Sequence, residues 1–353
     1  MTGPASRRRS PYCGSPQIRL LALRVRLTDC GNPVSADSPD APHSPRSRPT
    51  VTLFPSQSGG AGQLRELLRA TDRTGSIVQA PGCFDGLSAR VLEQAGFEVG
   101  FLGGFSVAAA RLGLPDVGLL SYGEMIDQAR SVCAATSLPI IGDADTGYGN
   151  PINAERTLLG CAQAGLACAM IEDQAWPKRC GHTAGKEVVD RNEAVQRIRA
   201  CVRTRQEHGL DILIMARTDA CATDGLGEAL WRAAAFADAG ADITFVEALE
   251  TVDQMERYCT EVPGWTTVNL VEDGQTPWLD PGSLADIGYS IVIYPVSLLL
   301  GGISAMGRAA RNLESSGDAG GPRATFDDAR DLVGWADYEK RVRTLEADDA
   351  ESC

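Results

Sequence analysis

The sequence Pro139-Ile-Ile-Gly-Asp143 is followed by a helix-like segment, Ala154–Ala164, and then by a second apolar run, Cys168-Ala-Met-Ile-Glu172. Short apolar runs of this kind predict buried strands, and the glycine after the intervening segment is typical of a helix C-terminus. Two such strands joined by a helix form a parallel βαβ unit. Both runs end in a carboxylate, so we expect the two carboxylates to lie at the same edge of a sheet.

The same alternation of strand and helix continues on both sides of this unit, from about residue 62 onward. Helices are expected at Gly86–Ala95, Tyr122–Ala135, Ala154–Ala164, Arg191–Glu207, Gly227–Ala239 and Val252–Thr260. Strands are expected at Ser76–Ala80, Val99–Gly103, Pro139–Asp143, Cys168–Glu172, Ile212–Arg217, Ile243–Glu247, Thr266–Leu270 and Ser290–Tyr294. A doubly wound sheet would also alternate, but eight strands within about 230 residues favour closure into a (β/α)8 TIM barrel of the α/β class.

The chain divides into three predicted parts. Residues 1–60 are rich in Arg, Ser and Pro and predict a disordered extension. Residues 61–315 predict the catalytic barrel, and residues 316–353 a C-terminal helical segment and tail, with one or two helices near Asp328–Leu345. The first 28 residues lack acidic side chains, which resembles an organellar transit peptide, although a flexible tail or a misassigned start codon would look the same. We expect a cytoplasmic protein, or a mitochondrial one if this extension is a transit peptide.

Composition and charge limit the possible classes of function. With 353 residues, 43% of them hydrophobic and 22% charged, the chain has the composition of a globular protein with a large core. Residues 1–50 contain eight arginines and three aspartates, which give this segment a net charge of +5. The whole chain carries −13, so residues 51–353 carry −18. This acidic body argues against nucleic acid or an anionic membrane as a partner. The 11 cysteines form no small-domain framework, which predicts free thiols in a reducing compartment.

Polar side chains end strand after strand in the predicted barrel: Asp143, Glu172, Arg217, Glu247 and Asn269. The C-terminal ends of barrel strands form the catalytic face of essentially every characterised barrel enzyme. Arg217 suits bidentate binding of a substrate carboxylate, with an ion pair to a neighbouring strand-end acid as the alternative. Glu247 and Asn269 could bind a second carboxylate or a hydroxyl, or form a polar network at the barrel mouth.

A cluster of carboxylates follows the third predicted strand. Asp143 and Asp145 are separated by one alanine and followed by Gly147 and Gly149, which allow a sharp turn close to a ligand. With Glu172 ending the next strand, these hard oxygen donors predict a Mg²⁺ site that could also accept Mn²⁺. An ordinary Asp-Thr-Gly turn is the alternative for the first two residues.

The segment Lys178-Arg-Cys180-Gly181-His182 carries a thiol and an imidazole side by side. Its spacing does not match a zinc knuckle. The flanking cations would lower the pKa of the thiol, so the cysteine could deliver a proton to a carbanion. The alternative is an exposed loop with an incidental cysteine.

Together these motifs resemble the isocitrate lyase/phosphoenolpyruvate mutase superfamily, from about Pro81 to Asn312. The motifs that agree in order are Pro81-Gly-Cys-Phe-Asp85, Leu112-Gly-Leu-Pro-Asp116, Asp143-Ala-Asp145-Thr-Gly, Ile171-Glu172-Asp173-Gln, Lys178-Arg-Cys180-Gly-His182, Ala216-Arg217-Thr-Asp219, and Asn269 with Glu272 and Thr276-Pro277. The resemblance implies a barrel whose eighth helix is exchanged between subunits, in a homotetramer built as a dimer of dimers.

The resemblance also assigns expected roles to individual residues. Asp145 corresponds to the direct Mg²⁺ ligand, while Asp143, Glu172 and Asp116 correspond to residues that bind the ion through water. Cys180 corresponds to the general acid. The further catalytic candidates are Lys178, His182 and Arg217, and the substrate-binding candidates are Gly103, Gly104, Gly181, Glu247 and Asn269.

Several branches of the superfamily keep the Cys-Gly-His loop: 2-methylisocitrate lyases, dimethylmalate lyases, oxaloacetate hydrolases and carboxyphosphonoenolpyruvate mutases. Two residues depart from the family pattern, since Gly103 replaces a Ser or Thr and Phe101 replaces a Tyr of the methylisocitrate lyases. Pro295 matches the lyases and the mutases. We expect a Mg²⁺-dependent carbon–carbon lyase acting on a small-molecule 2-hydroxy di- or tricarboxylate. The alternatives are phosphorus–carbon bond formation, oxaloacetate hydrolysis, or a barrel that only binds a dicarboxylate.

Overall fold

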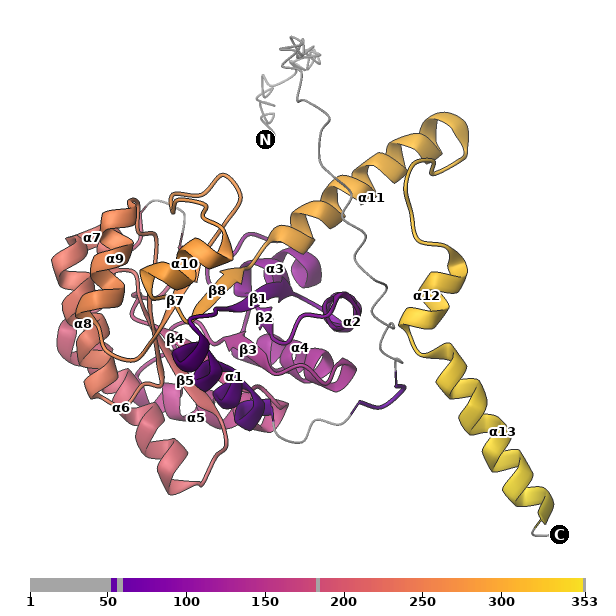
Figure 1. Cartoon of the computed structure of the whole chain (residues 1–353), viewed down its shortest axis with the longest axis horizontal. Coiled ribbons are helices and arrows are strands. Elements are labelled where there is room, and N and C mark those ends of the chain that lie inside the picture. Colours follow the sequence, from indigo (N-terminus) through magenta and orange to yellow (C-terminus); the bar gives the residue numbers. More distant parts are fainter. Residues whose placement is uncertain (1–51, 56–59, 182–184, 352–353) are drawn as a thin grey trace, which may run out of the picture. The chain divides into compact units, whose positions relative to one another are not determined.

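The described residues form a closed barrel of eight parallel strands in sequence order, which confirms the (β/α)8 prediction (Figure 1). This computed structural model describes residues 52–55, 60–181 and 185–351, so most of the predicted extension lies outside the described residues. The strands are β1 Val78–Cys83, β2 Gly100–Leu102, β3 Ile140–Asp143, β4 Cys168–Glu172, β5 Leu213–Thr218, β6 Ile243–Val246, β7 Trp265–Asn269 and β8 Ile291–Tyr294.

Strand β1 ends three residues later than the sequence predicts. The predicted strand ends at Ala80, and the next two residues are a proline and a glycine, both of which usually weaken a strand. In the structure Pro81 pairs with Tyr294 of β8, and Gly82 pairs with Phe101 of β2. A Cβ on Gly82 would lie 2.2 Å from the carbonyl oxygen of Pro295, so only glycine permits this approach of β1 to the end of β8.

Helices connect the strands and follow the last one, and their bounds agree with the predicted segments to within a few residues where a segment was predicted. They are α1 Gly60–Thr74, α2 Gly86–Ala95, α3 Gly104–Val107, the π-helix η1 Ala108–Leu112, α4 Tyr122–Ala135, α5 Pro151–Ala164, α6 Arg191–Glu207, α7 Ala220–Asp224, α8 Leu226–Asp238, α9 Val252–Glu261, α10 Pro281–Ile287, α11 Ser297–Ser316, α12 Phe326–Leu332 and α13 Trp335–Glu351. Two helices, α12 and α13, cover the segment in which one or two were expected.

Capping side chains determine where several of these helices begin. Helix α5 begins at Pro151, three residues before the predicted start, because the side chain of Asn150 accepts hydrogen bonds from Ile152 N at 3.0 Å and Asn153 N at 3.2 Å. Proline suits the first helical position since its missing N–H would be unpaired there. Asn150 therefore fixes the path of the chain directly after the carboxylates of β3.

Alternation along each strand separates the interior of the barrel from the layer beneath the helices. In β4, Cys168 and Met170 pack in the interior cluster, whereas Ala169 and Ile171 pack against the helices. Because side chains in a strand point alternately to opposite faces, Glu172 continues the interior row and Asp173 the outer row. The fold thus delivers one of two consecutive carboxylates to the mouth of the barrel.

The described part of the chain contains no helix that is both long enough and apolar enough to cross a membrane.

Candidate active site

Most strand-end residues singled out in the sequence continue interior rows of the barrel and reach one cavity. By the same alternation that places Glu172, Arg217 lies two residues after the interior Met215. Glu247 likewise lies two residues after the interior Phe245. The cavity has a volume of about 290 Å³. Its polar lining includes Asp116, Asp143, Glu172, Lys178, Cys180, Arg217, Glu247, Asn269 and Glu272, while Phe101, Phe105, Phe245, Val271, Ile293, Pro295, Val296 and Leu300 form an apolar lining.

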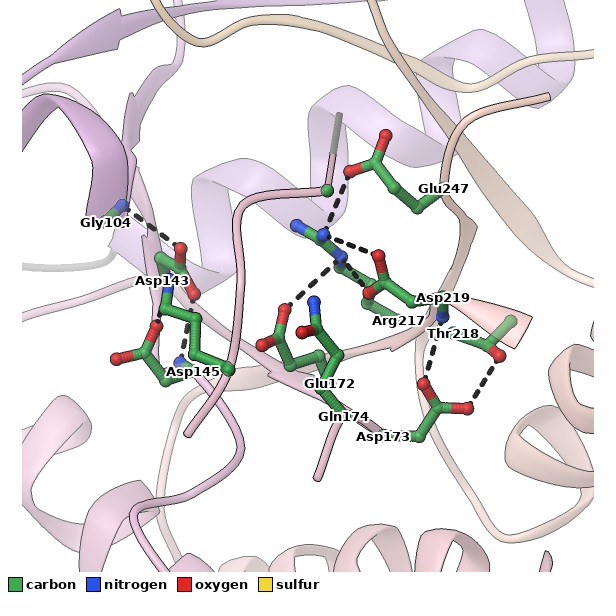
Figure 2. Close-up of polar contacts among 12 residues, drawn as sticks. Gly104, Asp143, Asp145, Glu172, Asp173, Gln174, Arg217, Thr218, Asp219 and Glu247 are labelled. Atoms are coloured by element: carbon green, nitrogen blue, oxygen red, sulfur yellow. Dashed lines mark hydrogen bonds and ion pairs between the residues drawn. The ribbon is translucent and has the colours of Figure 1, made fainter. Parts of the chain in front are cut away.

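Asp143 and Asp145 form a tight turn at the end of β3. Asp143 accepts hydrogen bonds from Gly104 N at 3.1 Å and from Asp145 N at 3.0 Å, so both of its carboxylate oxygens are held by backbone amides (Figure 2). Asp145 has a positive φ of 49°, a conformation that is uncommon for residues other than glycine. The Asp143 side chain compensates this conformation by bonding to the Asp145 amide, and the turn presents two carboxylates two residues apart.

The ammonium group of Lys178 lies among these carboxylates. Its Nζ atom is 2.7 Å from an oxygen of Asp116 and 2.8 Å from Oδ1 of Asp145, and the side chain is only 3% exposed. Burial lowers the pKa of Lys178, but the surrounding carboxylates outweigh this effect and raise the pKa well above its ordinary value. Lys178 therefore stays charged and balances part of a strongly negative group of side chains.

Asp145 and Glu172 are harder to ionise than ordinary carboxyl groups. Burial, together with the neighbouring Asp143 and Asp116, raises the pKa of Asp145 to about 6 despite the attraction of Lys178. Burial also raises the pKa of Glu172 well above its ordinary value, although Arg217 opposes the shift. A further cation at this place would therefore be strongly attracted.

The donor set at this place fits a hard divalent cation. Oδ1 of Asp145 and Oε1 of Glu172 are buried and make no hydrogen bond among the described residues, although Asp145 Oδ1 is in ion-pair contact with Lys178. In the described ranges, no three His, Cys, Asp or Glu side chains converge closely enough to form a metal site as they stand. The fit of this place to a metal ion therefore rests on buried carboxylate oxygens that lack hydrogen bonds to other described residues. Mg²⁺ prefers oxygen ligands of this kind.

Arg217 lies at the centre of a second group of carboxylates (Figure 2). Asp219 binds its guanidinium through two hydrogen bonds, from Nε at 2.9 Å and from Nη2 at 3.0 Å. Nε also lies 3.4 Å from Glu172, and Nη2 lies 3.2 Å from Glu247. The strand-end ion pair considered as an alternative for Arg217 is thus present, and these acids orient the guanidinium at the cavity wall.

The amide of Asn269 lies against Glu247. Its Nδ2 atom lies 3.4 Å and 3.3 Å from the two carboxylate oxygens of Glu247. The polar network that the sequence allowed for these two residues therefore exists, and it lines the same cavity as Arg217.

The segment that contains Cys180, the predicted general acid, passes next to Arg217 and Glu247. Cys180 is partly exposed and lines the cavity, and Gly181 is buried beside Arg217. A Cβ at position 181 would lie 2.5 Å from Arg217 Nη2 and 2.6 Å from Glu247 Oε2. Glycine is thus required for the backbone to come this close. His182, predicted to act beside Cys180, lies outside the described residues.

The side chain of Gln174 anchors this segment to the barrel. It accepts a hydrogen bond from Arg179 N at 2.8 Å and donates one to Arg179 O at 2.9 Å. The backbone of the following segment also pairs with this region, since Ala175 N donates to Glu187 O at 2.8 Å. These contacts place the backbone of Cys180 at the cavity.

The two departures from the family pattern are neighbours in space. Gly103 and Gly104 both line the cavity, and a Cβ on Gly103 would lie 2.9 Å from the ring of Phe101. The ring therefore takes space that a side chain at position 103 would need. A Cβ on Gly104 would lie 2.9 Å from Asp143 Oδ2, which explains why the second glycine is needed for the amide of residue 104 to reach that carboxylate.

Two buried residues of this region were not assigned a role from the sequence. Asp219 lies in the motif of Arg217 without a predicted role, and Lys186 belongs to none of the motifs, yet their side chains are 3.0 Å apart and almost completely buried. One signal could have identified the lysine. The chain has 33 lysines and arginines but only three lysines, and two of these three, Lys178 and Lys186, are buried here.

The chain is similar to known proteins over most of its length. A family model described as phosphoenolpyruvate phosphomutase matches residues 68–314. The 2,3-dimethylmalate lyase of Eubacterium barkeri is 41% identical over 277 residues, which cover 78% of this chain and 94% of the relative. The chloroplastic carboxyvinyl-carboxyphosphonate phosphorylmutase of Arabidopsis thaliana is 39% identical over 280 residues, which cover 76% and 82%. A solved structure of oxaloacetate acetylhydrolase with 3,3-difluorooxalacetate matches with a TM-score of 0.78 at 33% identity, covering 82% of this chain and 97% of that one.

Proposed function

Because the chain belongs to the isocitrate lyase/phosphoenolpyruvate mutase superfamily, we propose that it is a Mg²⁺-dependent lyase. It cleaves a carbon–carbon bond of a 2-hydroxy di- or tricarboxylate and releases an α-keto acid, together with a monocarboxylate from a dicarboxylate substrate or a dicarboxylate from a tricarboxylate substrate. The observation that carries the proposal is the position of the Cys180 segment, whose Gly181 backbone packs directly on Arg217 and Glu247. That contact brings a thiol to the same cavity as the carboxylates of β3 and β4.

In this proposal Asp145 would hold Mg²⁺ directly and Asp143, Glu172 and Asp116 would hold it through water, with Mn²⁺ as a substitute. Bound there, Mg²⁺ would supply Lewis-acid stabilisation of negative charge on a substrate oxygen. The support is the buried, poorly satisfied oxygens of Asp145 and Glu172.

The protein's own residues bind and orient the substrate and supply a proton. Arg217, held in one orientation by Asp219, supplies hydrogen bonds and positive charge to a carboxylate of the substrate. A water molecule accepts the proton of the substrate hydroxyl, whose carbon becomes the carbonyl of the α-keto acid. The bond between this carbon and its neighbour breaks, and the electron pair of that bond stays on the neighbouring carbon. Cys180 then transfers its thiol proton to that carbon, which completes the second product.

Product analysis of the purified protein tests this function. The protein is incubated with Mg²⁺ and 2-methylisocitrate, isocitrate, 2,3-dimethylmalate or oxaloacetate, with and without EDTA. We expect one of the first three to release an α-keto acid in a reaction that EDTA abolishes and Mg²⁺ restores. Oxalate formed from oxaloacetate alone would replace the proposal by a hydrolase. No product from any of the four would refute the lyase, and phosphorus NMR with a phosphonate precursor would then test the mutase alternative.

The role of Cys180 is tested by replacing it with serine. We expect the Cys180→Ser variant to lose at least about 99% of turnover because a hydroxyl is a far weaker proton donor than a thiol. Cys259→Ser is the matched control, since Cys259 is partly buried on α9 and does not line the cavity. Full turnover by the Cys180 variant would show that another group is the acid.

We also propose that the active form is a homotetramer, a dimer of dimers in which α11 packs on a second subunit. Helix α11 supports this because only Leu299 along its 20 residues is buried, while Leu300, Ile303, Met306 and Leu313 are exposed. Exposed apolar residues in this number usually mark an interaction surface. Light scattering coupled to size-exclusion chromatography measures the assembly directly, and a monomer at micromolar concentration would contradict the proposal.

A further inference from the structure

Lys186 is a buried cation that makes two polar contacts with other described residues. Its side chain is 3% exposed, and its Nζ atom lies 3.0 Å from Oδ1 of Asp219. The same ammonium donates a hydrogen bond to the carbonyl oxygen of Gly181. A buried charge is strongly destabilising unless it is paired and hydrogen-bonded, so these two contacts decide where the ammonium sits.

Each contact leads to a different part of the proposed machinery. Asp219 binds the guanidinium of Arg217 through two hydrogen bonds, so one carboxylate is shared by Lys186 and Arg217. The carbonyl of Gly181 belongs to the residue after Cys180. The ammonium thus joins the orientation of Arg217 to the position of the backbone that carries the thiol.

The packing around Gly181 leaves little freedom for this backbone. A Cβ at Gly181 would meet Arg217 and Glu247 at less than 2.7 Å, so the segment already lies in contact with the charged cavity wall. A small shift of the Gly181 carbonyl would move Cys180 relative to the cavity. A displacement of about 1 Å in such a group can cost on the order of a hundredfold in rate.

The rarity of lysine in this chain agrees with a specific requirement for an ammonium group at position 186. Lysine accounts for only three of the 33 basic residues, so arginine is the ordinary cation of this chain. A guanidinium is planar and wide, whereas an ammonium is a compact donor that can point to a carboxylate and a carbonyl at once. Lys186 does not line the cavity, so it does not touch a substrate held there.

We propose that Lys186 is a positioning residue, whose ammonium clamps the Gly181 carbonyl against Asp219 and thereby holds Cys180 over the cavity in register with Arg217. The consequence for catalysis rests on the proposed function, but the clamp itself does not. Removing the ammonium should loosen the backbone at Cys180 while leaving the barrel folded.

The test compares Lys186→Met with Lys340→Met, which makes the same chemical change at an exposed position on α13. Two quantities are measured on the full chain. The first is kcat and KM with the substrate found by product analysis. The second is the limiting rate of Cys180 alkylation by iodoacetamide at high pH, followed by peptide mass spectrometry. The limiting rate is chosen because it reports access to the thiolate and no longer depends on the fraction of the thiol that is ionised, leaving only the weaker dependence of nucleophilicity on pKa.

For Lys186→Met we expect kcat to fall by about tenfold or more, as for the loss of one hydrogen bond to a charged group, with a smaller change in KM. The limiting alkylation rate of Cys180 should rise several-fold, and Lys340→Met should change neither quantity. Unchanged alkylation and unchanged kcat in a folded Lys186→Met protein would overturn the proposal.

A second variant covers the case in which Lys186→Met does not fold. Lys186→Arg keeps the charge near Asp219 but cannot reproduce the compact geometry, so kcat should still fall and Cys180 alkylation should still accelerate. Wild-type kcat and alkylation in this variant would show that only charge matters and would overturn the clamp. If the wild-type protein cleaves no substrate, the proposed function fails, while the alkylation measurement still decides the role of Lys186.

Discussion

The contact between Gly103 and the ring of Phe101 allows a quantitative prediction about stability. Gly103 has ordinary extended dihedral angles, φ −92° and ψ 141°, so a side chain there causes no backbone strain. The added Cβ would instead lie 2.9 Å and 3.4 Å from two ring carbons of Phe101, which is 4% exposed and belongs to the barrel core. The main cost of a substitution at position 103 should therefore come from this contact.

Two opposing effects decide whether Gly103→Ser stabilises or destabilises the protein. Gly103 precedes α3 as its N-cap without a side-chain hydrogen bond, so a serine hydroxyl there could gain a few tenths of a kcal/mol. Overpacking a buried site costs about 1–3 kcal/mol, and this cost should outweigh the gain from capping. For a domain of this size the net loss lowers Tm by about 2–6 °C at a fixed protein concentration.

A double-mutant cycle with Phe101→Leu isolates the contact. The smaller side chain removes the ring atoms that a residue at position 103 would meet, so Gly103→Ser should cost almost nothing in the Phe101→Leu background. We expect a coupling energy of about 1–2 kcal/mol, measured by urea unfolding. Gly123→Ser is the control, since a Cβ there meets nothing within 4 Å. Equal losses for Gly103→Ser in both backgrounds would refute this reasoning.

Three further predictions concern the site, the scaffold and the thiols. Gly181→Ala should lower kcat/KM by at least about tenfold because its Cβ would lie 2.5 Å from Arg217 Nη2. Steady-state kinetics measure this change, and an unchanged kcat/KM would show that the segment shifts freely. Asp173→Asn should reduce the free energy of unfolding by about 3–5 kcal/mol in urea titrations, because it breaks a fully buried pair with Arg232 at 3.1 Å; a loss below about 1 kcal/mol would contradict this. Burial raises the pKa of Cys133 and of Cys201 to about 12, so both should escape alkylation in the folded protein at pH 8. Alkylation of either thiol in the folded protein at pH 8 would disprove the burial. Because thiols in the unfolded chain ionise near pH 9, the free energy of unfolding should fall as the pH rises from about 9 to 12.

The prediction from sequence succeeded where one local pattern was sufficient. The eight strands, their order and the superfamily membership were confirmed, because apolar runs of strand length and the motifs at their ends are local signals. The bounds of helix α11 were not predicted, although the resemblance implied an eighth helix, and the helix continues through Gly301 and Gly302. Glycine lowers helix stability by about 1 kcal/mol but does not forbid the helix.

The arrangement of the site was only partly accessible from sequence. The sequence indicated which side chains reach the barrel mouth, because strand ends converge there. It did not indicate that Asp219 holds Arg217, or that Lys186 holds Gly181, since these pairs depend on side-chain directions in three dimensions. The roles of the individual residues, including the Mg²⁺ ligands and the acid, stay predictions for the experiments above.

The pairing of β4 with β5 has a consequence for how this protein can change over evolutionary time. Glu172 pairs with Arg217, and its sequence neighbour Asp173 faces the opposite way, toward Thr218 and Arg232. Losing or gaining one codon within β4 would exchange the two carboxylates, leaving the scaffold and the cavity each with the wrong acid. Heritable change in the strands is therefore confined to replacement of one residue by another, whereas changes of length can accumulate in the connecting loops.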